Sequence, residues 1–212
     1  MTSTSASIPF TESAPSPASS NDSATHRGRR HDLAVAALQT WSEHGYSHVS
    51  VRNVARRTRF SHGMVHYYFS SKDALVAECV RMLSNNHTFD TAGLDEAVDV
   101  TSYSAGLAAA IASSFRENRQ MHRIRYDLRN QSQFDSTLRT YADELEKIRY
   151  ERNDKIEQRY REFGWTFDPP FALLAAQVDA LIERAVREDS FGAPDAADQL
   201  YQDLLQILPR QA

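Results

Sequence analysis

Residues 50–72 read SVRNVARRTRFSHGMVHYYFSSK and predict two short helices separated by a tight turn. Ser50 and Ser61 are both good helix N-caps, because a serine hydroxyl can accept a hydrogen bond from a free amide of the first turn. After each serine, apolar residues recur at helical spacing, at positions 51, 54 and 55 and then at 65, 68 and 69. Two short helices joined in this way form a helix-turn-helix motif, whose second helix can enter the major groove of DNA.

The charge of the chain is unevenly distributed. The 212 residues carry a formal net charge of only −4, but the segment from Arg27 to Lys72 holds eight basic and two acidic residues. That segment therefore has a net charge of +6, which leaves −10 for the remainder of the chain. A basic module attached to an acidic body suits a protein that presents one face to phosphate.

Composition and motif content exclude several classes of protein. Cys79 is the only cysteine, so we expect no internal disulfide and no cysteine-cluster metal site, and we interpret it as a small apolar residue on a helix face. The chain shows neither a bilayer-spanning apolar run nor a secretory signal at its start, so we expect a cytoplasmic protein without a membrane partner. It also has no glycine-rich phosphate loop, nucleophile elbow or carboxylate dyad, so we expect neither an enzyme nor a bound cofactor. His62 and His66 have the spacing of a metal pair, but the motif offers no third ligand, so we expect no metal.

Helical periodicity continues through the rest of the chain. Residues 1–26 are rich in Ser, Thr, Ala and Pro and predict a disordered tail. We expect a helix over about 30–44 that ends at Gly45, and another over about 72–86 that joins the basic module to the acidic body. Further helices are expected at about 103–116, 117–130, 134–163 and 169–188, followed by a last helix before Pro209. Asp168 is the expected N-cap of the helix that follows it. No segment of the sequence shows the alternating pattern of a β-strand.

From Leu33 to Leu75 the chain resembles the DNA-binding domain of TetR-family transcriptional regulators. The resemblance is carried by Ala36-Ala37, Trp41, Gly45-Tyr46, Ser50-Val51, Val54-Ala55, Ser61, Gly63, Tyr67-Tyr68-Phe69 and Lys72-Asp73-Ala74-Leu75. Arg59, His62 and His66 depart from the residues usual in the family, which leaves base preference open. The resemblance implies an all-α protein with a helix-turn-helix DNA-binding domain at 27–72, joined to a helical effector-binding and dimerisation domain at 73–212.

The candidate DNA-binding residues fall into two sets. Reading a groove requires short polar side chains at the start of a helix, and the residues that supply them are Ser61, His62, Gly63 and His66. By the resemblance, Tyr67 and Lys72 contact phosphate, while Ser50 and Arg52 touch the DNA backbone from the preceding helix. The basic segment at 27–30 has two open interpretations, a solvated helix entrance or an arm lying along phosphates.

The same resemblance implies a homodimer, a small-molecule effector and a near-palindromic double-stranded operator. Two C-terminal helices would form the dimer, with expected contacts at Leu174, Val178, Leu181, Ala185, Leu200 and Leu204. The candidate pocket residues are Phe115, Met121, Arg125, Tyr126, Arg129, Phe134, Tyr141, Trp165, Phe171 and Gln177. Within this set Arg125 and Arg129 share a helix face, and they either pair with an anionic ligand or are solvated.

We therefore predict a sequence-specific transcriptional regulator, a repressor that a small-molecule effector releases from its operator. The alternative is a helical small-molecule-binding protein or enzyme whose basic N-terminal module does not read sequence. Salt-dependent binding to a palindrome favours the first hypothesis, and turnover of a small molecule without DNA favours the second.

Overall fold

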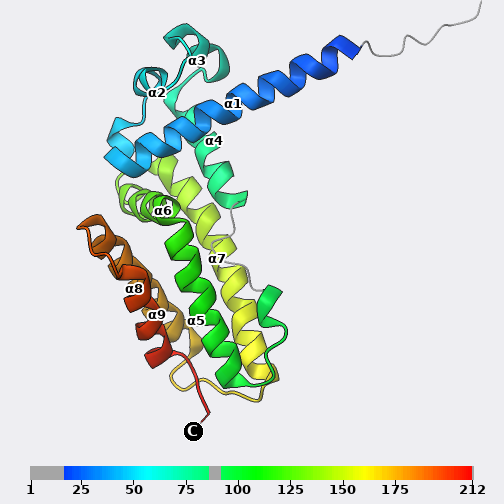
Figure 1. Ribbon diagram of the computed structural model, residues 1–212, viewed down its shortest axis with the longest axis vertical. Coiled ribbons are helices and arrows are strands. Elements are labelled where there is room, and N and C mark those ends of the chain that lie inside the picture. The colour runs from blue at the N-terminus through cyan, green and yellow to red at the C-terminus, as the bar shows by residue number, and fades with distance from the viewer. Residues whose placement is uncertain (1–16, 86–91, 212) are drawn as a thin grey trace, which may run out of the picture.

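The computed structural model describes residues 17–85 and 92–211, and within these ranges every regular element is helical (Figure 1). The elements are α1 (Pro17–His44), η1 (Tyr46–His48), α2 (Val51–Arg57), α3 (His62–Tyr68), α4 (Lys72–Asn85), η2 (Ala92–Leu94), α5 (Val100–Glu117), α6 (Arg119–Gln131), α7 (Ser136–Glu162), α8 (Phe171–Ser190) and α9 (Ala196–Ile207). This confirms the predicted all-α class. No helix in the described ranges is both long enough and apolar enough to cross a membrane.

Local interactions start and stop the helices of the motif where the sequence predicts. The Ser50 hydroxyl accepts a hydrogen bond from the Asn53 amide at 3.2 Å, and the Ser61 hydroxyl accepts one from the Met64 amide at 3.2 Å. Gly45 ends α1 with a φ of +81°, a left-handed conformation that favours glycine, while its amide donates to the Trp41 carbonyl at 2.8 Å. The starts of the two motif helices and the end of α1 are thus set by contacts within one turn.

The first helix is longer than expected. It begins at Pro17 rather than near Arg30, so the prediction of a disordered tail is wrong for residues 17–26, while residues 1–16 lie outside the described ranges. Extending an existing helix costs less than nucleating one, and proline is tolerated in the first turn. Polar composition alone therefore could not predict this extension, whose first turns project beyond the other helices in Figure 1.

Two hydrophobic cores hold the helices together. The first is formed by α1 to α4, and α6 and α7 complete it with residues such as Ile124 and Leu138. The second lies among α5, α8, α9 and the end of α7, where Tyr160 and Leu200 are fully buried. Because the first core continues from the helix-turn-helix into the body, its packing crosses the expected domain boundary at residue 72.

The start of α8 differs from the prediction. Pro170 is the N-cap residue and no side chain caps the helix, so the expected capping role of Asp168 is wrong. Phe171 begins the helix and is buried in the second core. The burial of this ring is a tertiary contact, and it favours an N-cap at Pro170, two residues after the Asp168 that the local sequence indicates.

Candidate DNA-binding face and cavity

Helix α3 turns one face toward solvent and the other into the first core. His62, Gly63, His66 and Tyr67 are exposed, whereas Val65 and Tyr68 are buried. The rings of His62 and His66 lie 4.6 Å apart between centroids, so they share one face, and the side chain of Tyr67 is 72% exposed. Within the described ranges no group of three His, Cys, Asp or Glu residues is placed to hold a metal ion. The predicted groove-reading residues thus lie together on one accessible helix, which is the placement that base contacts require.

The preceding helix adds positive charge beside this face. Arg52 and Arg56 on α2, together with Phe60 and His62, line a shallow hollow of about 400 Å³. Arg57 points elsewhere, because it forms an ion pair with Glu43 that ties α2 to α1. Ser50 is partly buried as the N-cap of α2, so Arg52 is the more accessible of the two predicted backbone contacts.

Lys72 lies in a different environment from the one expected. Its ammonium donates to the Tyr46 carbonyl at 3.3 Å and lies 3.6 Å from the centre of the Tyr46 ring. Burial lowers the pKa of this lysine, against the opposing charges of Asp135 and Asp73. In this structure Lys72 therefore holds η1 in place, and the contact with phosphate stays a prediction that requires its side chain to leave Tyr46.

The basic segment at residues 27–30 divides into two parts. The Arg30 guanidinium donates to the Tyr68 carbonyl at 2.9 Å, bonds Glu78 at 3.2 Å and lies 4.5 Å from the centre of the Phe69 ring. Arg27 and Arg29 are exposed. Arg30 thus joins α1 to α3 and α4, and the two open interpretations apply only to Arg27 and Arg29.

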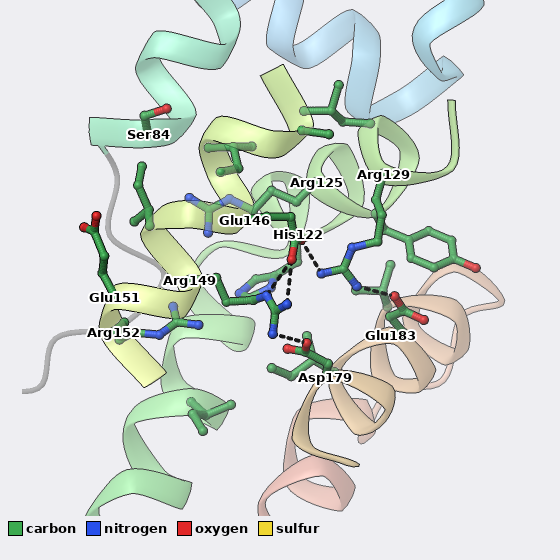
Figure 2. A pocket seen from close by; sticks show the side chains of 18 of the residues that line it. Ser84, His122, Arg125, Arg129, Glu146, Arg149, Glu151, Arg152, Asp179 and Glu183 are labelled. Atoms are coloured by element: carbon green, nitrogen blue, oxygen red, sulfur yellow. Dashed lines mark hydrogen bonds and ion pairs between the residues drawn. The ribbon is translucent and has the colours of Figure 1, made fainter. Parts of the chain in front are cut away.

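A cavity of about 680 Å³ lies among α4, α5, α6, α7 and α8 (Figure 2). Its apolar lining consists of Ile111, Leu128, Ala142, Leu145, Ile148, Ile182 and Val186. Its charged lining consists of Arg125, Arg129, Arg149, Arg152, Lys155, Glu146, Glu151, Asp179 and Glu183. This volume lies within the range of small-molecule sites in proteins, although the lining is more highly charged than is usual for them.

Ion pairs connect three helices across the cavity. Arg129 of α6 bonds Glu146 of α7 at 2.8 Å and Glu183 of α8 at 2.7 Å. Arg149 bonds both Glu146 and Asp179, each at 2.6 Å, as the dashed lines in Figure 2 show. Burial opposes the ionisation of Glu146, yet hydrogen bonds from Arg149 and Arg129 hold its pKa below its usual value. The α8 side of the cavity is therefore acidic but matched by these two arginines.

Three further residues of the cavity lining, His122, Arg125 and Arg152, are largely buried and have lowered pKa values. Burial, together with the charges of Arg125 and Arg152, lowers the pKa of His122 to about 3, so this ring is neutral at pH 7. Burial lowers the pKa of Arg125 to about 10, and burial and the charge of Arg125 do the same for Arg152. The charges of Arg125 and Arg152 thus disfavour protonation of His122, and the charge of Arg125 also acts on Arg152.

Three of the ten predicted pocket residues line this cavity, namely Arg125, Tyr126 and Arg129. The other seven do not line it. Phe115 and Phe171 are buried in the second core, and Trp165 packs against that core. Met121 and Tyr141 pack against the first core, and Phe134 and Gln177 are exposed. Large aromatic residues fill cores, which is why they were poor markers of the cavity. The sequence analysis missed four charged residues of the cavity lining because they belong to stretches of mixed charge, which have the same pattern as a solvated helix face. These residues are Glu146, Arg149, Arg152 and Asp179.

The predicted dimer contacts also need correction. Ala185, Leu200 and Leu204 are buried inside the second core of the same chain, so they are not available to a partner. Leu174, Val178 and Leu181 pack against that core but remain partly exposed. The large apolar residues exposed in this region are Leu173 on α8, at 55%, and Phe191 just after it, at 86%. Helical periodicity indicates that a face is apolar, but not which of two apolar faces points inward.

Comparisons with known proteins agree with the geometry of the motif. Residues 33–79 match the model of bacterial regulatory proteins of the tetR family. A 55-residue segment is 40% identical to the HTH-type transcriptional regulator BetI of Agrobacterium fabrum, and it covers 26% of this chain and 27% of BetI. The match thus spans about a quarter of the length of this curated relative.

Solved structures match over most of the chain. A transcriptional regulator from Saccharomonospora viridis in complex with choline aligns with a TM-score of 0.70 at 19% identity, over 87% of this chain and all of that one. The fatty acid degradation regulator FadR from Bacillus halodurans aligns with a TM-score of 0.64 at 19% identity, over 86% and 97%. The ketosteroid regulator KstR2 of Mycobacterium tuberculosis aligns with a TM-score of 0.64 at 19% identity, over 86% and 96%. At these identities the likeness establishes a shared fold.

Proposed function

We propose that this chain, a member of the tetR family of bacterial regulatory proteins, is a DNA-binding repressor released from its operator by a small-molecule effector. The observation that carries the proposal is the exposed polar face of α3, presented by a helix-turn-helix that shares one core with a body containing a cavity. The family match at residues 33–79 supports the DNA-binding half of this function. The cavity supports the effector-binding half.

The arrangement of the operator's two half-sites would follow from the two-fold symmetry of a dimer. Two copies related by a two-fold axis would place their α3 helices in successive major grooves, about 34 Å apart. A protein of this symmetry reads an inverted repeat. His62 and His66 would contact base edges, while Arg52 and Tyr67 would bond phosphates on either side.

The dimer is proposed to form through α8 and α9. Leu173 and Phe191 are large apolar side chains exposed to water along this side of the protomer. Leu174, Val178 and Leu181 would complete the contact from their partly exposed positions. Burying this surface in a second copy would remove it from water, which is the main favourable term in association.

Helix α6 is positioned to carry a signal between the cavity and the DNA-binding domain. The Asp127 carboxylate on α6 accepts hydrogen bonds from the Trp41 indole at 2.7 Å and from the Tyr46 amide at 2.8 Å. Arg125 and Arg129, two residues away on either side, line the cavity. An effector that moves α6 would therefore move the end of α1 and η1. It releases DNA only if it binds better to the state that cannot hold the operator.

The decisive experiment selects bound sequences from a random pool of DNA duplexes at two salt concentrations. We expect enrichment of one inverted repeat, and a changed preference at one or two base pairs for His66→Ala. Val98→Ala is the matched control, because this exposed side chain precedes α5 in the body rather than the helix-turn-helix, and its loss should leave the preference unchanged. Binding that occurs only at low salt, with no shared sequence, would reject sequence-specific recognition.

A further inference from the structure

The first helix of the protein runs past the helix that we assign to the major groove. Residues 17–25 precede His26 and add about 14 Å of helix at 1.5 Å per residue. Figure 1 shows α1 passing α3 and continuing beyond it. In the part of α1 whose side chains are described, residues 26–44, the buried residues begin only at Leu33. The turn before Leu33 is therefore not required by the first core.

Two side chains of this turn pack against the end of α3. The centre of the His26 ring lies 4.6 Å from that of Tyr68 and 5.9 Å from that of Tyr67. One turn later, the Arg30 guanidinium donates a hydrogen bond of 2.9 Å to the Tyr68 carbonyl. The Tyr67 side chain is 72% exposed and is the one that we assign to a DNA phosphate. This turn of α1 thus lies directly beside the proposed DNA-binding face.

The two other arginines of the same turn face solvent. Because an α-helix has 3.6 residues per turn, His26 and Arg30 share the face that packs against α3. Arg27 and Arg29 lie on either side of that face, and both are exposed. The stretch from His26 to His31 contains no acidic residue that could offset their charge locally. The exposed charge of this turn is therefore positive and continuous with the face of α3.

The composition of α1 favours a polyanion over other partners. Residues 17–26 read PASSNDSATH and contain no apolar side chain larger than proline. Such a segment offers little apolar surface to a protein or to a membrane. A basic surface beside a helix-turn-helix is complementary to the phosphates of the same duplex.

Resting on the proposed DNA-binding function, we infer that this turn of α1 is a second DNA contact, in which Arg27 and Arg29 bond phosphates beside the one that Tyr67 reaches. Arginine suits phosphate, because its planar fork can donate two parallel hydrogen bonds to it. Contacts to phosphate position a protein on the duplex without reading its bases. The contacted DNA backbone therefore extends past the base pairs that α3 reads, with no base preference there.

The helical form of this segment makes the contact less costly. Arg30 holds α1 in place through its bonds to the Tyr68 carbonyl and to the Glu78 carboxylate. Arg27 and Arg29 are therefore held next to α3 before DNA binds. A contact made from an ordered backbone costs less conformational entropy than one made by a segment that must first fold.

Paired variants of the full-length protein test the contact. Arg27→Gln/Arg29→Gln removes the two arginines, and Arg116→Gln/Arg161→Gln removes two exposed arginines of the body as the matched control. On the selected operator, the first variant should bind at least tenfold more weakly than the wild type, and its salt slope should fall by about 2 for each protomer. The control should keep the affinity and the slope of the wild type. Circular dichroism confirms that both variants are folded, and a wild-type salt slope for folded Arg27→Gln/Arg29→Gln overturns the inference.

Hydroxyl-radical footprinting locates the contact on the DNA. The wild type should protect backbone positions next to the base pairs of the enriched repeat, and Arg27→Gln/Arg29→Gln should lose this protection while it still protects the repeat. The variant should also select the same repeat as the wild type, because phosphates carry no base identity. Identical footprints for the two proteins would show that α1 does not touch DNA. Loss of a base preference beside the repeat would place the arginines in the minor groove and overturn the assignment to phosphate.

The outcomes also separate this contact from the function on which it rests. If no inverted repeat is enriched by the wild type, sequence-specific recognition fails and the second contact fails with it. If a repeat is enriched and Arg27→Gln/Arg29→Gln binds it with the affinity and footprint of the wild type, the DNA-binding function stands and only the contact through α1 is refuted.

Discussion

One carboxylate of α6 hydrogen-bonds the DNA-binding domain, in addition to the packing of the first core, and Asp127→Ala tests its contribution. One oxygen of Asp127 accepts hydrogen bonds from the Trp41 indole at 2.7 Å and from the Tyr46 amide at 2.8 Å, and the Trp41 side chain is only 1% exposed. Removal of the carboxylate leaves the buried indole N–H without its acceptor. We expect this to weaken the junction between α1 and the body.

The size of the effect follows from the two lost bonds. A hydrogen bond to a charged group contributes about 1.5–3 kcal/mol, and leaving a buried donor unsatisfied costs about 1–3 kcal/mol. Asp127 itself is partly exposed, so water can replace part of the lost interaction. We therefore expect Asp127→Ala to lower the free energy of unfolding by about 2–4 kcal/mol. Asp127→Asn keeps one acceptor oxygen and should cost about 1 kcal/mol.

Urea denaturation at one fixed protein concentration measures these differences, because the stability of an oligomer depends on its concentration. Asp198→Ala is the matched control, since this carboxylate is exposed and bonds Arg116 at 2.6 Å on the surface. Exposed ion pairs contribute about 0–1 kcal/mol, so the control should change little. A double-mutant cycle with Trp41→Phe should give a coupling free energy of about 1–2 kcal/mol. A loss below about 0.5 kcal/mol for Asp127→Ala, or strict additivity in the cycle, would refute the reasoning.

Three further changes test other parts of the molecule. Burial lowers the pKa of His122 to about 3 in the folded protein. As the pH falls below about 6.5, the imidazole is therefore protonated in the unfolded chain but stays neutral in the folded one, which favours unfolding. Between pH 6.5 and pH 5 the wild type should therefore lose up to about 2 kcal/mol more stability than His122→Gln, and parallel pH profiles from denaturation would contradict this. Leu173→Glu should raise the dissociation constant of the dimer at least tenfold in sedimentation equilibrium, because it places a charge on an exposed apolar face, whereas Val98→Glu, exposed elsewhere, should not. Lys72→Ala should weaken operator binding across all sequences and reduce the salt slope by about 1, and an unchanged slope would limit Lys72 to holding Tyr46.

The sequence alone was sufficient to determine the helix-turn-helix. Its helices begin at Ser50 and Ser61, and the preceding α1 ends at Gly45, because capping bonds and a left-handed φ are set by residues within one turn. The buried faces of α2 and α3 follow from helical periodicity for the same reason. Such local features can be recognised without knowing what lies opposite them.

Only the tertiary structure showed which residues line the cavity and which apolar helix faces of the body point into its core. Arg125 and Arg152 lie on α6 and α7, far apart in the chain, and an arginine on a polar helix has the same pattern whether it meets water or another helix. Leu200 belongs to the core of its own chain and Leu173 does not, although both lie on apolar stripes. Lys72 bonds a carbonyl of η1 that no pattern around it indicates. Each of these outcomes depends on which element packs opposite, and that is settled by contacts between distant parts of the chain rather than by the spacing of neighbours.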